Sequence, residues 1–148
     1  MALTPINLDV ILGEELEAEE VEESAVVTSE PSKTWAIDFE SGRIRGFIDE
    51  TEAVRQYVIK ALMTARNRYL IYDDDYGEEI RDLIGQNVTN DLINVEIPRL
   101  VREAIIYDDR ISDVTDIVIT EYGKDGIHIA FTVILTDDET IEFDEVVI

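Results

Sequence analysis

Three neighbouring aspartates, Asp73, Asp74 and Asp75, are the first residues whose type and spacing suggest chemistry, because clustered carboxylates bind calcium. An EF-hand loop needs oxygen ligands at positions 1, 3 and 5, a glycine at position 6 and a glutamate at position 12. With Asp73 at position 1, Gly77 stands at position 5 and Ile84 at position 12, so the pattern fails. A solvated turn explains the cluster better than a calcium site.

Signals for catalysis are equally weak. His128 is the single histidine, and the sequence shows neither the nucleophile nor the orienting partner that a general base needs. With 35 Asp and Glu residues, a carboxylate pair can always be chosen, so such a pair does not indicate a glycosidase. Cysteine and the glycine-rich phosphate-binding motifs are absent from the sequence. We therefore expect a non-enzymatic protein with no catalytic residue, no metal site and no cofactor.

The charge of the chain restricts its partners. Its 148 residues carry 12 Lys and Arg against 35 Asp and Glu, a formal net charge of −23. Such a surface is repelled by nucleic acid phosphates and by anionic membranes, so we expect neither as a partner. No apolar run approaches the length of a membrane span, and Met1 to Leu12 lack the basic start of a secretory signal. The expected location is the cytoplasm, or an assembly built there.

The charge distribution predicts two regions. Residues 1–32 contain nine acidic residues and no Lys or Arg, whereas residues 33–148 contain 26 acids and all 12 bases. The stretch 14–23 is too acidic to fold alone, although apolar residues precede it. We expect 1–32 to be an acidic, partly flexible extension, acting either as a docking peptide on an acidic tether or as a frayed terminus. Residues 33–148 are expected to form one folded domain.

Periodicity in residues 33–148 predicts an α+β fold. Apolar residues at three- and four-residue spacings indicate helices over 51–66 and 89–106, and Pro98 should kink or split the second one. Asp49 is the expected helix cap, and a short helix is expected over 78–84. Strands are expected at 34–39 and 43–48 as a hairpin, at Tyr69–Tyr72 as a brief segment, and in a C-terminal three-stranded meander. The predicted architecture is an antiparallel sheet, formed by the hairpin and the meander, packed with two main helices.

The final strand has features of an assembly surface. Residues 137–148 contain six acids and no base, and the chain stops at Val146-Val147-Ile148. A strand at the edge of a sheet exposes backbone groups that can pair with another strand. Its acidic residues would oppose indiscriminate pairing and favour a basic partner strand. This pattern points to assembly rather than to catalysis.

The order of the motifs resembles a known family. Thr34-Trp35-Ala36-Ile37-Asp38, an amphipathic helix, and then Arg66-Asn67-Arg68-Tyr69-Leu70-Ile71-Tyr72 and Asp75-Tyr76-Gly77 resemble the small baseplate wedge proteins of contractile phage tails. The match is best to the subgroup of defective prophages and R-type bacteriocins. Ile97 to Ile105, Asp108-Asp109-Arg110-Ile111 and the terminal meander resemble its second half. Where the wider family has Phe-Gly and Glu-Pro-Arg, this sequence has Tyr76-Gly77 and Asp108-Asp109-Arg110, which leaves the backbone at 109 an open question.

The resemblance implies a sheath initiator that joins the baseplate wedge and starts sheath polymerisation by strand exchange. It implies wedge contacts through Tyr76, Gly77 and Arg110. The expected partners are the sheath protein and wedge proteins, with tube or hub proteins as further candidates, and several copies form a ring in the particle. We expect the C-terminal edge strand to bind sheath strands through Thr140, Ile141, Glu142, Phe143, Asp144, Glu145, Val146, Val147 and Ile148.

An alternative from another class is a small acidic inhibitor or DNA mimic, whose carboxylates imitate phosphates. The excess of acid supports it, but the acids are spread over the N-terminal region and the turns rather than one face. Salt-sensitive binding to a nuclease or repressor would favour this alternative.

Overall fold

The computed structural model describes residues 32–148, apart from residues 85, 87 and 124–125. The proposed roles of the N-terminal extension therefore lie outside the described residues. The elements in chain order are β1 (Thr34–Asp38), β2 (Arg43–Ile48), α1 (Glu50–Met63), the 3₁₀ helix η2 (Ile80–Asp82), α2 (Asn90–Ile105), β3 (Ile111–Gly123), β4 (Gly126–Leu135) and β5 (Thr140–Val147). No helix in these ranges is long and apolar enough to cross a membrane.

The predicted C-terminal meander is confirmed. Strands β3, β4 and β5 form an antiparallel sheet in the order β3-β4-β5, with β4 in the centre. Along β4, residues 127, 129, 131, 133 and 135 are buried and alternate with half-buried residues. This period of two places one face of the sheet in the core and leaves the other open. Among the described elements, the sheet is therefore covered on one side only.

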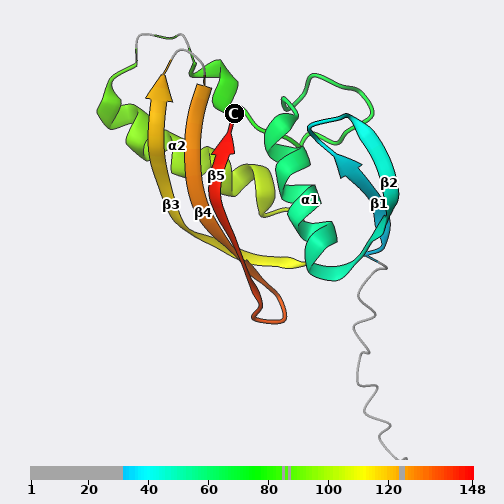
Figure 1. The fold of residues 1–148 in the computed structure, drawn as a ribbon. Coiled ribbons are helices and arrows are strands. Elements are labelled where there is room, and N and C mark those ends of the chain that lie inside the picture. The colour runs from blue at the N-terminus through cyan, green and yellow to red at the C-terminus, as the bar shows by residue number, and fades with distance from the viewer. Residues whose placement is uncertain (1–31, 85, 87, 124–125) are drawn as a thin grey trace, which may run out of the picture.

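Both main helices supply apolar residues to that core. Val54, Val58 and Leu62 of α1 and Ile97, Val101 and Ile105 of α2 belong to one buried cluster with the sheet residues. Figure 1 shows α2 lying across the sheet and α1 standing between β5 and the N-terminal hairpin. Asp49 is the N-cap of α1, as expected, and its carboxylate accepts from the Glu50 N–H at 2.8 Å.

Pro98 does not split the second helix, contrary to one of the two expected outcomes. The helix α2 is continuous from Asn90 to Ile105 with Pro98 inside it. Proline removes only one backbone donor, the one that would serve the Asn94 carbonyl. The flanking residues Ile97, Leu100 and Val101 are buried. Their packing keeps the two halves in one helix.

Two short predicted elements differ from the structure. Tyr69–Tyr72 is a turn rather than a strand, because the Tyr72 N–H bonds to the Tyr69 carbonyl at 3.2 Å instead of to a neighbouring strand. The helix expected over 78–84 is reduced to the single turn of η2. A β-prone composition alone does not make a strand when no partner strand lies beside it.

The N-terminal hairpin is confirmed, but it forms a sheet of its own. Among the described strands, β1 pairs with β2 alone, and neither strand contains a fully buried residue. Gln56 of α1, which is only 8% exposed, connects the hairpin to the domain. Its amide accepts from the Ile37 N–H at 2.6 Å and donates to the Trp35 carbonyl at 2.8 Å. The glutamine thus bonds the outer edge of β1 as a neighbouring strand would.

We predict that Gln56→Met, which keeps the side-chain length and removes both bonds, loosens the hairpin. The expected cost is about 1 kcal/mol per bond. With two bonds lost, hydrogen exchange of residues 34–48 should accelerate about thirtyfold, while exchange of β4 stays unchanged. Gln86→Met, at an exposed glutamine, is the matched control. Equal hairpin exchange in both variants would contradict this role of Gln56.

Candidate functional site

Arg110, one of the residues implied in wedge binding, is held in a fixed orientation by its own loop. Its Nε and Nη2 donate to the two carboxylate oxygens of Asp108 at 2.8 and 2.7 Å, and its backbone N–H donates to the same carboxylate at 3.0 Å. Burial alone would raise the pKa of Asp108, but the bonds from Arg110 outweigh burial and hold that pKa below its usual value. A turn closed by the Ile111 N–H and the Asp108 carbonyl places Asp109 at the surface.

A row of tyrosines connects Arg110 to Tyr76. The Arg110 guanidinium lies 5.9 Å from the ring centre of Tyr57, which meets Tyr76 edge-on at 6.0 Å. Tyr76 in turn stacks on Tyr72 at 4.5 Å. Burial raises the pKa of Tyr57 and of Tyr76 to about 12, so both phenols stay neutral at physiological pH. Residues from α1, from the loop after it and from the turn before β3 therefore form one surface, which we call the tyrosine–arginine surface (Tyr57, Tyr72, Tyr76, Asp108 and Arg110).

The backbone geometry at position 77 requires glycine, and this residue offers a partner no side chain. Its φ is +106°, and a Cβ placed on it would lie 2.6 Å from the Thr64 carbonyl oxygen. Immediately beside it, the Glu78 N–H donates to the Thr64 carbonyl at 2.8 Å and the Arg66 N–H donates to the Glu78 carbonyl at 2.9 Å. These two bonds close the base of loop 64–78. Only glycine allows the chain segments to approach so closely here.

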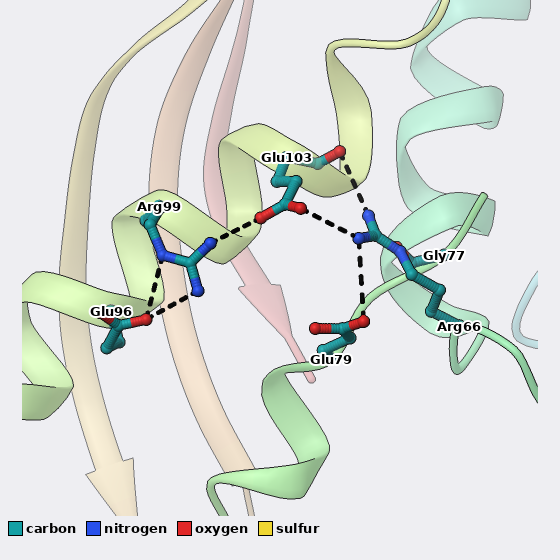
Figure 2. Close-up of polar contacts among 6 residues, drawn as sticks. All are labelled: Arg66, Gly77, Glu79, Glu96, Arg99 and Glu103. Atoms are coloured by element: carbon teal, nitrogen blue, oxygen red, sulfur yellow. Dashed lines mark hydrogen bonds and ion pairs between the residues drawn. The ribbon is translucent and has the colours of Figure 1, made fainter. Parts of the chain in front are cut away.

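Arg66 connects this loop to α2 (Figure 2). Its side chain is only 8% exposed and donates to the carbonyls of Gly77 at 3.2 Å and Glu103 at 3.3 Å. The guanidinium also pairs with the Glu103 carboxylate at 3.3 Å and lies 3.8 Å from that of Glu79. Arg99 extends the network, since it pairs with Glu103 at 2.7 Å and with Glu96 at 2.8 Å. Arg66 therefore attaches the loop to α2.

The second candidate surface is the edge formed by β5. Among the described strands, β5 pairs with β4 only, so its other side is an open edge, as expected. Ile141, Phe143 and Ile148 are buried in the core and are not available to a partner. Thr140, Glu142, Asp144, Glu145 and Val147 are exposed, and Val146 is half-buried. Glu145 also binds His128 of β4, with 2.6 Å between Oε1 and Nδ1.

Part of this edge already has a side-chain partner. Arg55 of α1 donates to the Glu142 carbonyl at 3.2 Å, and its guanidinium lies 5.0 Å from the ring centre of Phe143. Near the start of the strand, the Thr51 hydroxyl donates to the Glu139 carboxylate at 2.8 Å. Helix α1 thus contacts the edge at residues 139–143 and leaves the backbone edge at 144–147 without a contact from it among the described bonds.

The structure connects Tyr76 to Arg110 through Tyr57, and Gly77 follows Tyr76 in the same loop. Tyr57, Arg66 and Arg55 were not identified as site residues from the sequence. Tyr57 lies in the apolar repeat of the first helix, which indicated only a core position. For the two arginines, no signal in the sequence marks the distant atoms they bind.

Comparison with known proteins decides the family. The model of the contractile injection system sheath initiator family matches residues 33–138. The chain belongs to this sheath initiator family. It is also 45% identical to the phage-like element PBSX protein XkdS of Bacillus subtilis (strain 168), over 99% of this chain and 97% of that protein. The likeness to a protein of a phage-like element agrees with the resemblance to the defective-prophage subgroup.

Membership of the sheath initiator family makes the chain a structural component of a contractile tail or tail-like particle. It supports a role in initiating the sheath and contacts with sheath and baseplate components. The match covers the elements from β1 to β4, including the tyrosine–arginine surface, and ends at the turn before β5. The edge strand must therefore be argued from its own geometry.

We predict that Gly77→Ala destabilises the fold by about 3 kcal/mol, because the new Cβ meets the Thr64 carbonyl and the positive φ is strained. Gly42→Ala is the control, since Gly42 also has a positive φ but a Cβ added there would have no atom within 4 Å. It should cost only about 1 kcal/mol. Urea denaturation measures both, and equal losses would contradict the close approach at Gly77.

The lowered pKa of Asp108 predicts a pH-dependent contribution to stability. A carboxyl group whose pKa is lowered in the folded state stabilises the fold at pH values above its unfolded pKa, about 3.9. This contribution disappears as the pH falls through the folded pKa. Wild type should exceed Asp108→Asn by about 2 kcal/mol at pH 7, and the difference should shrink below about pH 4. Urea denaturation of both proteins between pH 7 and pH 3 measures it. A difference that does not vary with pH would show that the charge of Asp108 is not responsible.

Proposed function

We propose that this protein is a non-enzymatic baseplate subunit that joins the wedge and initiates the sheath by pairing its β5 edge with an extended strand of a sheath subunit. The observation that carries the proposal is the open edge of β5 in a sheath initiator. Assembly takes place in the bacterial cytoplasm, with several copies in a ring. The family lends no support to the acidic inhibitor alternative.

The backbone geometry of β5 supports strand addition. Ile148 and Ile127 exchange both backbone hydrogen bonds, at 3.0 and 3.1 Å. In an antiparallel pair the bonding direction alternates, so the N–H and C=O of Val147 point away from β4. On the other side of a register shift in β5, the Glu142 carbonyl also points outward, because Arg55 of α1 reaches it. An incoming strand would therefore find the donor and the acceptor of Val147 directed toward it.

Arg55 gives the incoming strand a defined starting point. The Arg55 guanidinium already donates to the Glu142 carbonyl, so a partner strand would begin its pairing after Phe143. To extend further, the partner would have to displace the Arg55 side chain. The register shift of β5 against β4 lies between Phe143 and Val146, and it disturbs the regular spacing there. Together these features favour one short segment, 144–147, over indiscriminate pairing along the strand.

Charge on β5 selects the sheath strand, and the number of copies in the ring strengthens the binding. Glu142, Asp144 and Glu145 are exposed on β5, and they favour a sheath strand with basic residues at matching positions. One short strand gives modest affinity by itself, but several copies in a ring add avidity when they engage one sheath ring.

The tyrosine–arginine surface is proposed to contact the wedge. Arg110 is 31% exposed by side chain and is oriented by Asp108 and Tyr57, so little conformational entropy is lost when it binds. Gly77 contributes by shaping the loop that carries Tyr76. In this proposal the wedge and the sheath bind different surfaces of the domain.

We predict that Val147→Pro blocks sheath initiation without unfolding the protein. The variant removes one outward N–H, whereas the bonds to β4 made by Ile148 remain. Deleting β5 would be a poorer test, because Ile141, Phe143 and Ile148 belong to the core. In cells producing the particle, the variant should reduce sheathed tails at least about tenfold, as counted by electron microscopy.

Val147→Ala is the matched control, since it shortens the same side chain and keeps the N–H; it should assemble sheaths normally. Thermal unfolding must show that both variants are folded. Normal numbers of sheathed tails with folded Val147→Pro would refute pairing at this edge. Loss of sheaths in both variants would assign the effect to the side chain instead.

A further inference from the structure

Leu70 and Ile71 are more exposed than any other large apolar residues in the described part of the chain. Leu70 is fully exposed, at 107% of its reference area, and Ile71 is exposed at 85%. They are consecutive, and the half-exposed rings of Tyr69 and Tyr72 flank them. Single exposed apolar residues need no explanation, but two adjacent aliphatic side chains held in water indicate a contact surface. We call Leu70 and Ile71 the apolar tip.

The loop that carries the apolar tip is ordered by its own contacts. The Tyr72 N–H bonds to the Tyr69 carbonyl at 3.2 Å and the Tyr76 N–H bonds to the Asp73 carbonyl at 3.1 Å. The Tyr69 and Tyr72 rings meet edge-on at 6.5 Å, and Tyr72 stacks on Tyr76. Binding through a loop that is already ordered loses little conformational entropy.

The base of the loop is fixed to the rest of the domain. The bonds between Thr64, Arg66 and Glu78 close it, and Arg66 attaches it to α2 through Glu103 (Figure 2). In Figure 1 the loop extends from the C-terminal end of α1. The apolar tip is therefore a rigid projection, and it is separate in sequence from the β5 edge.

Charge indicates the kind of partner. Asp73, Asp74 and Asp75 follow the apolar tip after Tyr72 and are all exposed, whereas Arg68 is the one exposed base shortly before it. An anionic membrane would repel this loop. A protein pocket with an apolar floor and basic residues on its rim matches both the aliphatic side chains and the carboxylates.

We propose that the apolar tip inserts into a basic-rimmed apolar pocket of a neighbouring baseplate protein and anchors this chain in the particle. The inference rests on the proposed baseplate role and names a contact for it. Burial of two aliphatic side chains supplies affinity, and the three aspartates supply orientation. The tyrosine–arginine surface at the base of the same loop lies next to this contact through Tyr72.

The test uses cells that produce the particle without its sheath protein, so that failure at the β5 edge cannot affect the result. Leu70→Ser with Ile71→Ser should lower the amount of this chain in purified baseplate–tube particles at least about tenfold, measured by immunoblot. Val95→Ser with Leu92→Ser, at exposed aliphatic residues of α2, is the matched control and should be incorporated like wild type. The melting temperature of the tip variant should not fall, because its side chains are not in the core.

Charge and competing partners are tested separately. Asp73→Asn with Asp74→Asn and Asp75→Asn should reduce incorporation less than the tip variant and should weaken its dependence on salt. Incorporation of the tip variant at the wild-type level would overturn the proposal. So would binding of wild type, but not of the tip variant, to phosphatidylcholine–phosphatidylglycerol vesicles, which would assign the tip to a membrane.

Discussion

The near-complete burial of the Arg66 guanidinium is the constraint on which both ends of the long loop depend. A buried cation is costly unless its donors are used, and Arg66 uses them on two backbone carbonyls and on Glu103. One of those carbonyls belongs to Gly77, whose positive φ allows the loop base to close. Arg66 thereby sets the position of loop 64–78 against α2. The positions of the tyrosine row and of the apolar tip follow from it.

The position of β5 at the edge of the sheet creates the second proposed binding region. The C-terminal segment 140–148 must bury Ile141, Phe143 and Ile148 to complete the core, yet the outer backbone of β5 has no partner strand among the described elements. The same segment thus stabilises the core and has the binding role proposed above, and the two are divided by the alternation of side chains and of hydrogen-bonding directions. Arg55 connects the two roles, because it packs on Phe143 and occupies the Glu142 carbonyl.

The structure shows which of the charged residues behind the net charge of −23 are paired within the domain and which are exposed. Several arginines are paired internally: Arg66, Arg99 and Arg110 all bind carboxylates of the same domain. The exposed acids near the apolar tip and on β5 are then available to partners. These exposed carboxylates repel nucleic acid and anionic membranes at the proposed binding surfaces, and they favour basic protein partners.

Periodicity determined the α+β class, the two helices, the hairpin and the meander, because amphipathic spacing and alternation are local properties that packing then reinforces. It failed at Tyr69–Tyr72, where no partner strand lies alongside among the described elements. Of the two outcomes expected at Pro98, the split did not occur, because the neighbouring residues of the helix are buried. The order of motifs also predicted Tyr76, Gly77 and Arg110 as wedge contacts, which remains a prediction. Only the tertiary structure placed Tyr57 between Tyr76 and Arg110, Arg66 on Glu103 and Arg55 on Glu142, because contacts across 37 or 87 residues leave no periodic signal in one sequence.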